Sequence, residues 1–479
     1  MKNLVLFLLF ETLSFHSISQ ISFENPVIYW THNIDTYCLA EDFNNDSLDD
    51  LILFTKFYLD SVNDYKIHMY KQENNELVFE GIISYPAVFP GLSSYAVGDI
   101  NNDKRKDLII GYHDTVMIYF QNSTGFFSES NRIRFYSGTD VYGIAAGDLN
   151  HDGLDDIAVS HWNEDTVRVY HQAGPLLFKK ISYYKKIAIK NELIITDIND
   201  DGFNDLVLSN GWAVSSMIPD ANKYSFAIYL QDTVTGLLQN HKLYKIEDGP
   251  HNFVLGIAVE DINKDGLKDV VTTQTEDVQI WLHNKNSPLL FENYPPMINT
   301  YHNPGPVSVS DINNDGKFEI IVGNTGWSRI SVYESDENHV FTDYKLFSCY
   351  IATHARSHQF SFGDLNSDGK IDIVTGTWGA SSILYNNSSL NAIPETLKKQ
   401  FVSEIFPNPV AGNAFWIKCN EFDETGWKLW SLDGVVISNG TLQSGLEKIV
   451  IPSTGNYNTY ILEIFKHNVT LGRTKIIKI

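Results

Sequence analysis

An acidic stretch of nine residues occurs seven times in this chain of 479 residues, and it constrains the fold more than any other feature. The copies begin at Asp42, Asp99, Asp148, Asp197, Asp261, Asp311 and Asp364, at spacings of 49 to 64 residues. Most follow the pattern D-x-N-x-D-G-x-x-D. Self-similarity at a fixed period indicates an array of repeated structural units, so seven units are predicted.

Each nonapeptide lies within a longer repeat that has the hydrophobic pattern of β-strands. Residues such as 95–98 alternate in polarity before the nonapeptide, and an aliphatic run such as 108–111 follows it. A third run contains an aromatic residue at a matching place, and a fourth extended run completes the unit. Four strands per repeat predict an all-β, seven-bladed β-propeller. The aromatic residues are Tyr70, Tyr119, Tyr170, Tyr229, Trp281, Tyr333 and Tyr385.

The seventh repeat lacks a fourth strand after Tyr385, whereas residues 21–30 have the fourth-strand pattern without a blade of their own. We therefore expect residues 21–30 to form the outer strand of blade 7, which would close the ring without an unpaired edge. The propeller is predicted to span residues 21–388.

The nonapeptide places oxygen-bearing side chains at positions 1, 3, 5 and 9, and the position-7 carbonyl can point into the same space. Calcium prefers six to eight such oxygens. Glycine at position 6 permits a left-handed turn, and the apolar residue at position 2 would anchor the loop. The predicted calcium ligands are Asp42, Asn44, Asp46, Asp50, Asp99, Asn101, Asp103, Asp107, Asp148, Asn150, Asp152, Asp156, Asp197, Asn199, Asp201, Asp205, Asp261, Asn263, Asp265, Asp269, Asp311, Asn313, Asp315, Glu319, Asp364, Asn366, Asp368 and Asp372.

The charge of the chain fits this interpretation. The formal net charge is −24, and positions 1, 5 and 9 of the seven copies hold 21 carboxylates. Without a cation these carboxylates would repel one another, and seven calcium ions would reduce the net charge to −10. The acidity disfavours a nucleic-acid partner, because phosphate binding needs a basic surface.

Metal-free Asx turns are the alternative interpretation of the nonapeptides, since Asp and Asn favour turns. The copies also differ from one another. Ser47 and Lys104 replace the position-6 glycine, and Arg105 and Lys106 follow Lys104, which predicts weak or absent binding in that copy. Glu319 replaces aspartate at position 9 of the sixth copy.

On these motifs the seven units resemble FG-GAP/VCBS repeats, the calcium-loop blades of integrin α-subunit heads and many bacterial surface proteins. The resemblance covers residues 21–388 and implies a calcium-bound propeller. It does not imply a particular ligand, because one fold hosts many functions.

The two ends of the chain indicate export. Residues 1–20 have a basic start, a short apolar run and a small polar stretch, as a signal peptide does. No later run reaches the length of a transmembrane helix. After a linker at 389–400, residues 401–479 alternate as in a small β-sandwich. They are similar to the C-terminal sorting domain of the type IX secretion system through Phe406-Pro407-Asn408-Pro409, Leu432-Asp433-Gly434 and Lys475-Ile476-Ile477-Lys478.

That similarity implies a partner in the type IX secretion machinery and a location outside a Gram-negative cell, either released or attached to the outer-membrane surface.

A candidate ligand-binding face lies opposite the metal loops, where the turns between the second and third strands carry Trp162, Trp212, Trp327 and Trp378. Such aromatic side chains can stack on sugars or grip a protein loop. The alternative is that each tryptophan packs between adjacent blades.

The sequence favours a binding or adhesion module for a glycan or an extracellular protein over an enzyme. A polysaccharide lyase or glycosidase built on the propeller is the alternative function. His354 and His358 have the spacing of a zinc helix, but they precede a predicted strand, which would separate them differently. Whether Cys38 and Cys349 form a disulfide is left open.

Overall fold

The structure is a computed structural model that describes residues 21–30, 34–56, 65–85, 92–162, 164–174, 177–186, 192–211, 225–245, 254–274, 277–285, 290–293, 298–302, 304–324, 329–336, 339–349, 360–376, 380–388, 402–406, 414–419, 425–431, 436–442, 446–451, 459–466 and 469–477. The predicted signal peptide and linker therefore lie outside the described residues. The chain divides into two compact units, one of which is Ser22–Asn387 and the other of which includes Ser388–Ile479.

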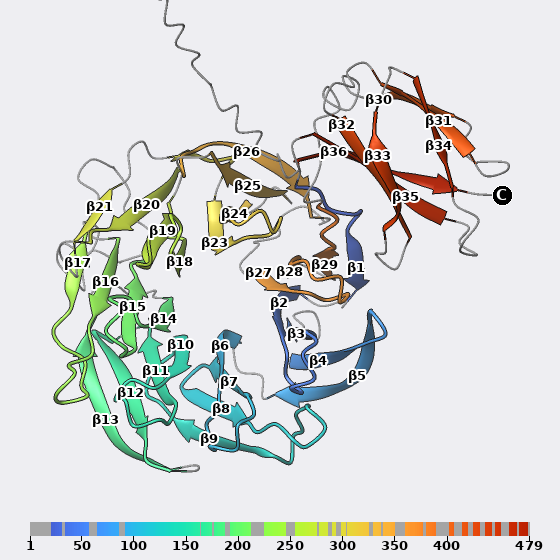
Figure 1. Ribbon diagram of the computed structural model, residues 1–479. Coiled ribbons are helices and arrows are strands. Elements are labelled where there is room, and N and C mark those ends of the chain that lie inside the picture. Colours follow the sequence, from blue (N-terminus) through green and yellow to red (C-terminus); the bar gives the residue numbers. More distant parts are fainter. Residues whose placement is uncertain are drawn as a thin grey trace, which may run out of the picture. The chain divides into compact units, whose positions relative to one another are not determined.

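The first unit is a seven-bladed β-propeller (Figure 1), and each blade is an antiparallel sheet whose strands follow one another in sequence from the centre outward. Blades 1 to 3 consist of β2 (Ile34–Glu41), β3 (Asp50–Lys56), β4 (Tyr65–Glu73) and β5 (Glu76–Tyr85); β6 (Leu92–Gly98), β7 (Asp107–Tyr112), β8 (Thr115–Tyr119) and β9 (Arg132–Tyr136); and β10 (Val141–Gly147), β11 (Asp156–His161), β12 (Thr166–Gln172) and β13 (Phe178–Lys185).

Blades 4 to 6 consist of β14 (Leu193–Thr196), β15 (Asp205–Ser209), β16 (Phe226–Tyr229) and β17 (Lys242–Tyr244); β18 (Gly256–Glu260), β19 (Asp269–Thr273), β20 (Asp277–His283), β21 (Phe291–Asn293) and β22 (Ile298–Asn299); and β23 (Pro304–Ser310), β24 (Glu319–Asn324), β25 (Arg329–Ser335) and β26 (Phe341–Ser348). In blade 5 both β21 and β22 pair with β20, so two short segments share the outer position.

Blade 7 confirms the predicted closure of the ring. It consists of β27 (Phe360–Gly363), β28 (Asp372–Gly376), β29 (Ala380–Leu384) and, outermost, β1 (Val27–Trp30) from the start of the propeller. Antiparallel pairing of Val27 with Ile383 and of Trp30 with Ala380 sets the register. The first and last parts of the propeller chain therefore share one sheet.

The hydrophobic core lies between adjacent blades, because alternate residues of a strand face opposite sides of its sheet. In β7, Leu108 and Ile110 pack with Phe54 of blade 1, whereas Ile109 packs with Ile157 of blade 3. All six residues of β7 are buried, as expected for a strand covered on both faces.

The third-strand aromatic residues occupy matching places in six blades, each paired with the residue that follows position 9 of the nonapeptide. In blade 7 the expectation for Tyr385 is wrong by one residue. Leu384 pairs with Ile373, which follows Asp372. Tyr385 comes after the strand, where it hydrogen-bonds Tyr29.

In the second unit, β30 (Val402–Phe406), β31 (Ala414–Cys419) and β34 (Leu446–Val450) form one sheet. The other sheet contains β33 (Val436–Thr441), β32 (Thr425–Ser431), β35 (Thr459–Lys466) and β36 (Val469–Ile477). One hydrophobic cluster draws on both sheets, including Phe415 of the first and Leu429 of the second. Within the described residues we find no helix with the length and apolarity needed to cross a lipid bilayer.

Candidate functional site

Each nonapeptide forms the loop between the first and second strands of its blade, and we number the loops 1 to 7 by blade. Position 6 has a positive φ in all seven loops, as the glycine pattern predicts. Ser47 (φ 70°) and Lys104 (φ 68°) adopt this conformation without glycine, at a strain of about 1–2 kcal/mol each. Position 4 also has a positive φ in every loop, which the sequence analysis missed; these residues are Asn45, Asn102, His151, Asp200, Lys264, Asn314 and Ser367.

The apolar residue at position 2 anchors every loop, as predicted. Phe43, Ile100, Leu149, Ile198, Ile262, Ile312 and Leu365 are all at most 1% exposed. Ile100, for example, packs in the cluster between blades 2 and 3. The loops are thus held in the interfaces between blades.

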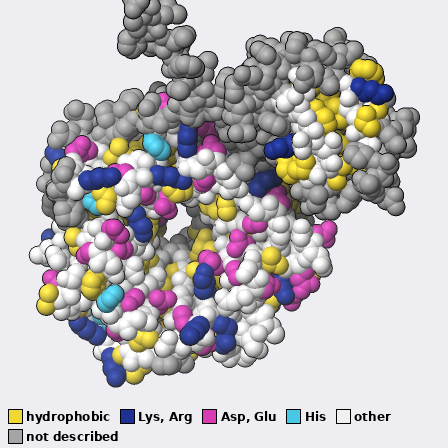
Figure 2. Space-filling model, viewed as in Figure 1, with side chains coloured by type: hydrophobic (Ala, Val, Ile, Leu, Met, Phe, Trp, Pro, Cys, Tyr) yellow, Lys and Arg dark blue, Asp and Glu magenta, His cyan; other side chains and the backbone are white. Residues whose placement is uncertain are grey.

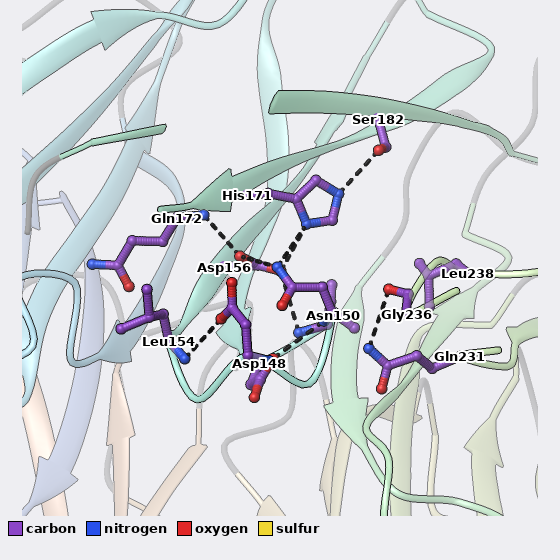
Figure 3. A network of polar contacts seen from close by, with 12 residues as sticks. Asp148, Asn150, Leu154, Asp156, His171, Gln172, Ser182, Gln231, Gly236 and Leu238 are labelled. Atoms are coloured by element: carbon purple, nitrogen blue, oxygen red, sulfur yellow. Dashed lines mark hydrogen bonds and ion pairs between the residues drawn. The ribbon is translucent and has the colours of Figure 1, made fainter. Parts of the chain in front are cut away.

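Loop 3 shows the internal hydrogen bonds that recur in all seven loops (Figure 3). The backbone amides of Asp152 and Gly153 donate to the two carboxylate oxygens of Asp148, at 3.2 and 2.8 Å, and the amide of Leu154 donates to Asp152 at 3.0 Å. These are Asx turns. They are compatible with a bound cation, because a carboxylate offers about four lone-pair sites.

The position-9 carboxylates are the most buried of the predicted ligands, at 0 or 1% exposure. In loop 3 the backbone amide of Leu149 donates to Oδ2 of Asp156 (3.3 Å) and that of Gln172 donates to Oδ1 (2.8 Å). Position 9 therefore ties the loop to the third strand of its own blade. The same third-strand amide contact is made by Gln72, Gln121, Gln231, His283 and Asn386 in blades 1, 2, 4, 5 and 7.

The side chains of this third-strand position reach the preceding blade. Nε2 of Gln72 donates to the carbonyl of Asp364 (3.1 Å), Gln172 donates to the carbonyl of Ile100, and Asn386 to that of Ile312. The signal in the sequence is an amide side chain two residues after the third-strand aromatic, which the analysis of the sequence did not use.

Burial raises the pKa of the position-9 carboxyls, and the nearby carboxylates of positions 5 and 1 raise it further. For Asp205 and Asp269 the pKa rises to about 7, and for Glu319 to about 9. Three carboxylates of one loop thus lie near enough to repel one another, which is the electrostatic situation that a divalent cation relieves.

The residues fit calcium in a second respect. Oδ1 of Asn101 and Oδ1 of Asn150, both at position 3, are buried atoms without a hydrogen-bond partner, and a buried acceptor left unsatisfied is costly. Among the described residues, no three Asp, Glu, His or Cys side chains are gathered as a metal centre by themselves. The loops instead offer the mixture of carboxylate, amide and main-chain oxygens that calcium takes.

Protein cations lie beside four of the loops. Arg105 is ion-paired with Asp103 in loop 2, and Lys71, Lys285 and Lys370 lie 3.9, 3.7 and 3.2 Å from the position-5 carboxylates of loops 1, 5 and 7. In loop 3 the buried His171 contacts Asp156 at 2.9 Å through Nδ1 and Ser182 at 3.0 Å through Nε2 (Figure 3).

At the opposite ends of the inner strands, Trp162 is the one predicted aromatic ligand residue that the structure describes. Its amide donates to the carbonyl of Asp140 (2.7 Å) and its ring lies 5.7 Å from that of Tyr142. Trp212, Trp327 and Trp378 lie outside the described residues, as do His354 and His358, so the aromatic ring stays a prediction.

A buried polar network supports the turn that carries Trp162. Oγ of Ser137 lies 3.0 Å from Nε2 of His161, and Glu164 lies 3.7 Å from Nδ1 of the same ring. Burial lowers the pKa of His161 to about 4, so this imidazole is neutral at pH 7. Although a serine, a histidine and a glutamate meet here, Ser137 is wholly buried, and we assign the network a structural role.

Cys38 and Cys349 are both buried and both free thiols. Burial raises the pKa of each to about 12, so neither is a reactive thiolate near neutral pH. The disulfide that the sequence left open is absent.

Comparison with known proteins finds FG-GAP-like repeats at residues 42–110, 99–159, 261–322 and 311–375. The chain therefore carries FG-GAP-like repeats folded as a seven-bladed propeller. It is 25% identical over 294 residues to the T-cell immunomodulatory protein homolog of Plasmodium falciparum, and 24% identical over 255 residues to protein linkin of Caenorhabditis elegans. These matches cover 53% and 47% of this chain but 40% of each relative.

Among solved structures, the chain is similar to PorZ, a surface component of the type IX secretion system of Porphyromonas gingivalis, with 10% identity and a TM-score of 0.48 over 90% of this chain and 58% of PorZ. It is also similar to the Dos1 propeller, with 9% identity and a TM-score of 0.44 over 76% of this chain and 95% of that structure.

Proposed function

We propose that this protein is a calcium-binding adhesion module, secreted or displayed on the cell surface, that binds a glycan or an extracellular protein. The observation that carries the proposal is the shared geometry of the seven loops, which present carboxylates in the same left-handed turn in every blade. Calcium would be held by positions 1, 3, 5 and 9, and it would neutralise the repulsion among those carboxylates.

The ligand would bind at the end of the propeller opposite these loops. Val141 pairs with His161, so the start of β10 and the turn carrying Trp162 lie together, remote from loop 3 at the far end of β10. An aromatic pair there, supported by a buried polar network, is a surface suited to sugar or peptide stacking. The metals would brace the blades without touching the ligand.

Export by a type IX secretion system is part of the same proposal. It rests on the signal-peptide pattern of residues 1–20 and on the resemblance of residues 401–479 to a sorting domain. The readout would be the location of the full chain in a type IX-competent bacterium, with and without residues 401–479.

The binding function is tested with a glycan array and an extracellular-protein array probed with the calcium-loaded full chain. We expect a ligand whose binding is lost on Trp162→Ala, with Trp30→Ala as the control because Trp30 is an exposed tryptophan on the outermost strand of blade 7. Release of unsaturated or hydrolysed sugar products would instead favour an enzyme.

A further inference from the structure

Four residues from four consecutive blades lie near one end of the central channel. Tyr37 belongs to β2, Tyr95 to β6 and Tyr142 to β10, and Glu192 directly precedes β14. Each lies four to six residues before the first aspartate of its loop, so all four are near the end of the ring remote from the loops. The surface is hollowed at the centre of the ring (Figure 2).

The electrostatic contacts show that these side chains face a common space. The Glu192 carboxylate raises the pKa of the phenols of Tyr95 and Tyr142, although burial is the larger cause in each. Since Tyr95 belongs to blade 2 and Glu192 to blade 4, they are not in adjacent blades and can interact only across the channel. Tyr37 acts on both phenols in the same way, and its ring lies 6.4 Å from that of Tyr95.

Glu192 is a carboxylate crowded by protein yet open to water. Its side chain is exposed, while burial raises the pKa of its carboxyl to about 7 and the amide of Ile257 hydrogen-bonds it. These two observations agree for a group on the wall of a narrow channel. Among the described residues, no lysine, arginine or histidine forms an ion pair with it.

The tyrosines complete a set suited to a positive charge. The Tyr95 hydroxyl donates to the carbonyl of Cys38 (2.7 Å), so its oxygen keeps lone pairs for a donor in the channel. Aromatic rings also attract cations through their faces. The inner strands have register irregularities just before Tyr37, in β6 and at Tyr142, and such bulges commonly re-aim side chains at binding sites.

We propose that this end of the channel is a binding site for an organic cation, an ammonium or guanidinium group, with Glu192 as its counter-ion and Tyr37, Tyr95 and Tyr142 as its walls. The inference deepens the proposed binding function by giving the ligand a chemical class, and it rests on that function only for the choice of face. A lysine or arginine side chain of a protein partner and a free polyamine would both supply this group.

The test is a calorimetric and saturation-transfer NMR titration of the calcium-loaded full chain with Nα-acetyl-arginine amide, Nα-acetyl-lysine amide and spermidine. Nα-acetyl-glutamine amide and maltose are the neutral comparisons. We expect the cations to bind and the neutral compounds not to bind. Tighter binding of an arginine-containing peptide than of spermidine would identify a protein side chain as the source, and the reverse order a polyamine.

Glu192→Gln should weaken cation binding about tenfold, because a hydrogen bond to a charged group contributes about 1.5–3 kcal/mol. Glu76→Gln is the matched control, since it removes the same charge from an exposed residue of β5. Tyr142→Leu should weaken binding, whereas Tyr142→Phe, which keeps the ring, should bind nearly as wild type. An unchanged melting temperature at pH 5 would show that Glu192→Gln still folds.

Equal cation binding by wild type and Glu192→Gln would overturn the assignment, as would binding of maltose alone or of none of the compounds. These outcomes leave the proposed function separately testable. A ligand found on the arrays and lost on Trp162→Ala would keep the adhesion function even if no cation binds in the channel.

Discussion

The carboxylate of Asp155 accepts a hydrogen bond of 2.8 Å from the backbone amide of Asp99, the first residue of the loop in the preceding blade. Asp49 makes the same contact with the amide of Asp364 across the junction of blades 1 and 7, also at 2.8 Å. Position 8 of one nonapeptide therefore holds position 1 of its neighbour, and adjacent loops are mechanically connected.

The residue before each loop is matched to this contact. Gly98 precedes loop 2, and a Cβ there would lie 3.0 Å from Oδ2 of Asp155. Where position 8 is a lysine the partners change, since Lys106 is ion-paired with Glu41 and Lys268 bonds the hydroxyl of Thr196. In blade 4, Asn204 donates to the carbonyl of Asp148 (3.2 Å).

Replacing Asp155 with alanine should destabilise the propeller by about 1–3 kcal/mol, because the amide of Asp99 would lose its partner in a partly buried site. The measurement is the urea-unfolding midpoint of the full chain without calcium. Asp343→Ala is the control, since Asp343 is exposed on β26. An equal shift in the two variants would show that the contact across the blades contributes nothing.

The calcium loops should differ in affinity, and the position-5 carboxylates of loops 4 and 2 test this as a matched pair. Asp201→Ala should lower the number of bound ions by one and lower the melting temperature of the calcium-loaded chain. Asp103→Ala should leave the number unchanged, because Arg105 already neutralises Asp103 and Lys104 follows it. The ions are counted by equilibrium dialysis and elemental analysis. Loss of one ion in both variants would contradict the expected difference.

Calcium removal should change the sign of the pH dependence. Without metal, the folded-state pKa of Asp205 and Asp269 is raised from 3.8 to about 7, so the folded state binds protons more tightly than the unfolded state. The stability from this tight protonation is complete at low pH and is lost as pH rises from about 4 to about 7. The calcium-free chain should therefore melt at a lower temperature at pH 7.5 than at pH 5.

With calcium the order should reverse, because the metal binds the ionised carboxylates and its affinity rises as they deprotonate. The melting temperature should increase with free calcium at pH 7.5 more than at pH 5. If calcium had no effect at either pH, the loops would be Asx turns alone.

Removing residues 22–30 should open the ring. The deletion leaves β29 as an unpaired edge, which promotes strand addition and aggregation, so we expect a lower melting temperature and soluble oligomers by light scattering. A peptide of residues 21–30 added in excess should restore the monomer by pairing with β29. Trp30→Ala, which removes an exposed side chain of the same strand, should have little effect.

Much of the fold was readable from the sequence because each repeat carries its information locally. The nonapeptide specifies its turn through position 6 and its anchor through a buried residue such as Ile100, and the following aliphatic run specifies a strand covered on both faces. The count of repeats, together with the unpaired outer-strand pattern of residues 21–30, predicted seven blades and their closure.

The tertiary structure alone decided which side chains meet between blades. Nothing near Asp155 in the sequence shows that it binds the amide of Asp99, and nothing near Glu192 shows that it shares a channel with Tyr95. These contacts depend on how the blades are placed around the ring and on the twist of each sheet. Hydrophobic periodicity reports which face of a strand is buried, but it does not report which residue of another blade that face meets.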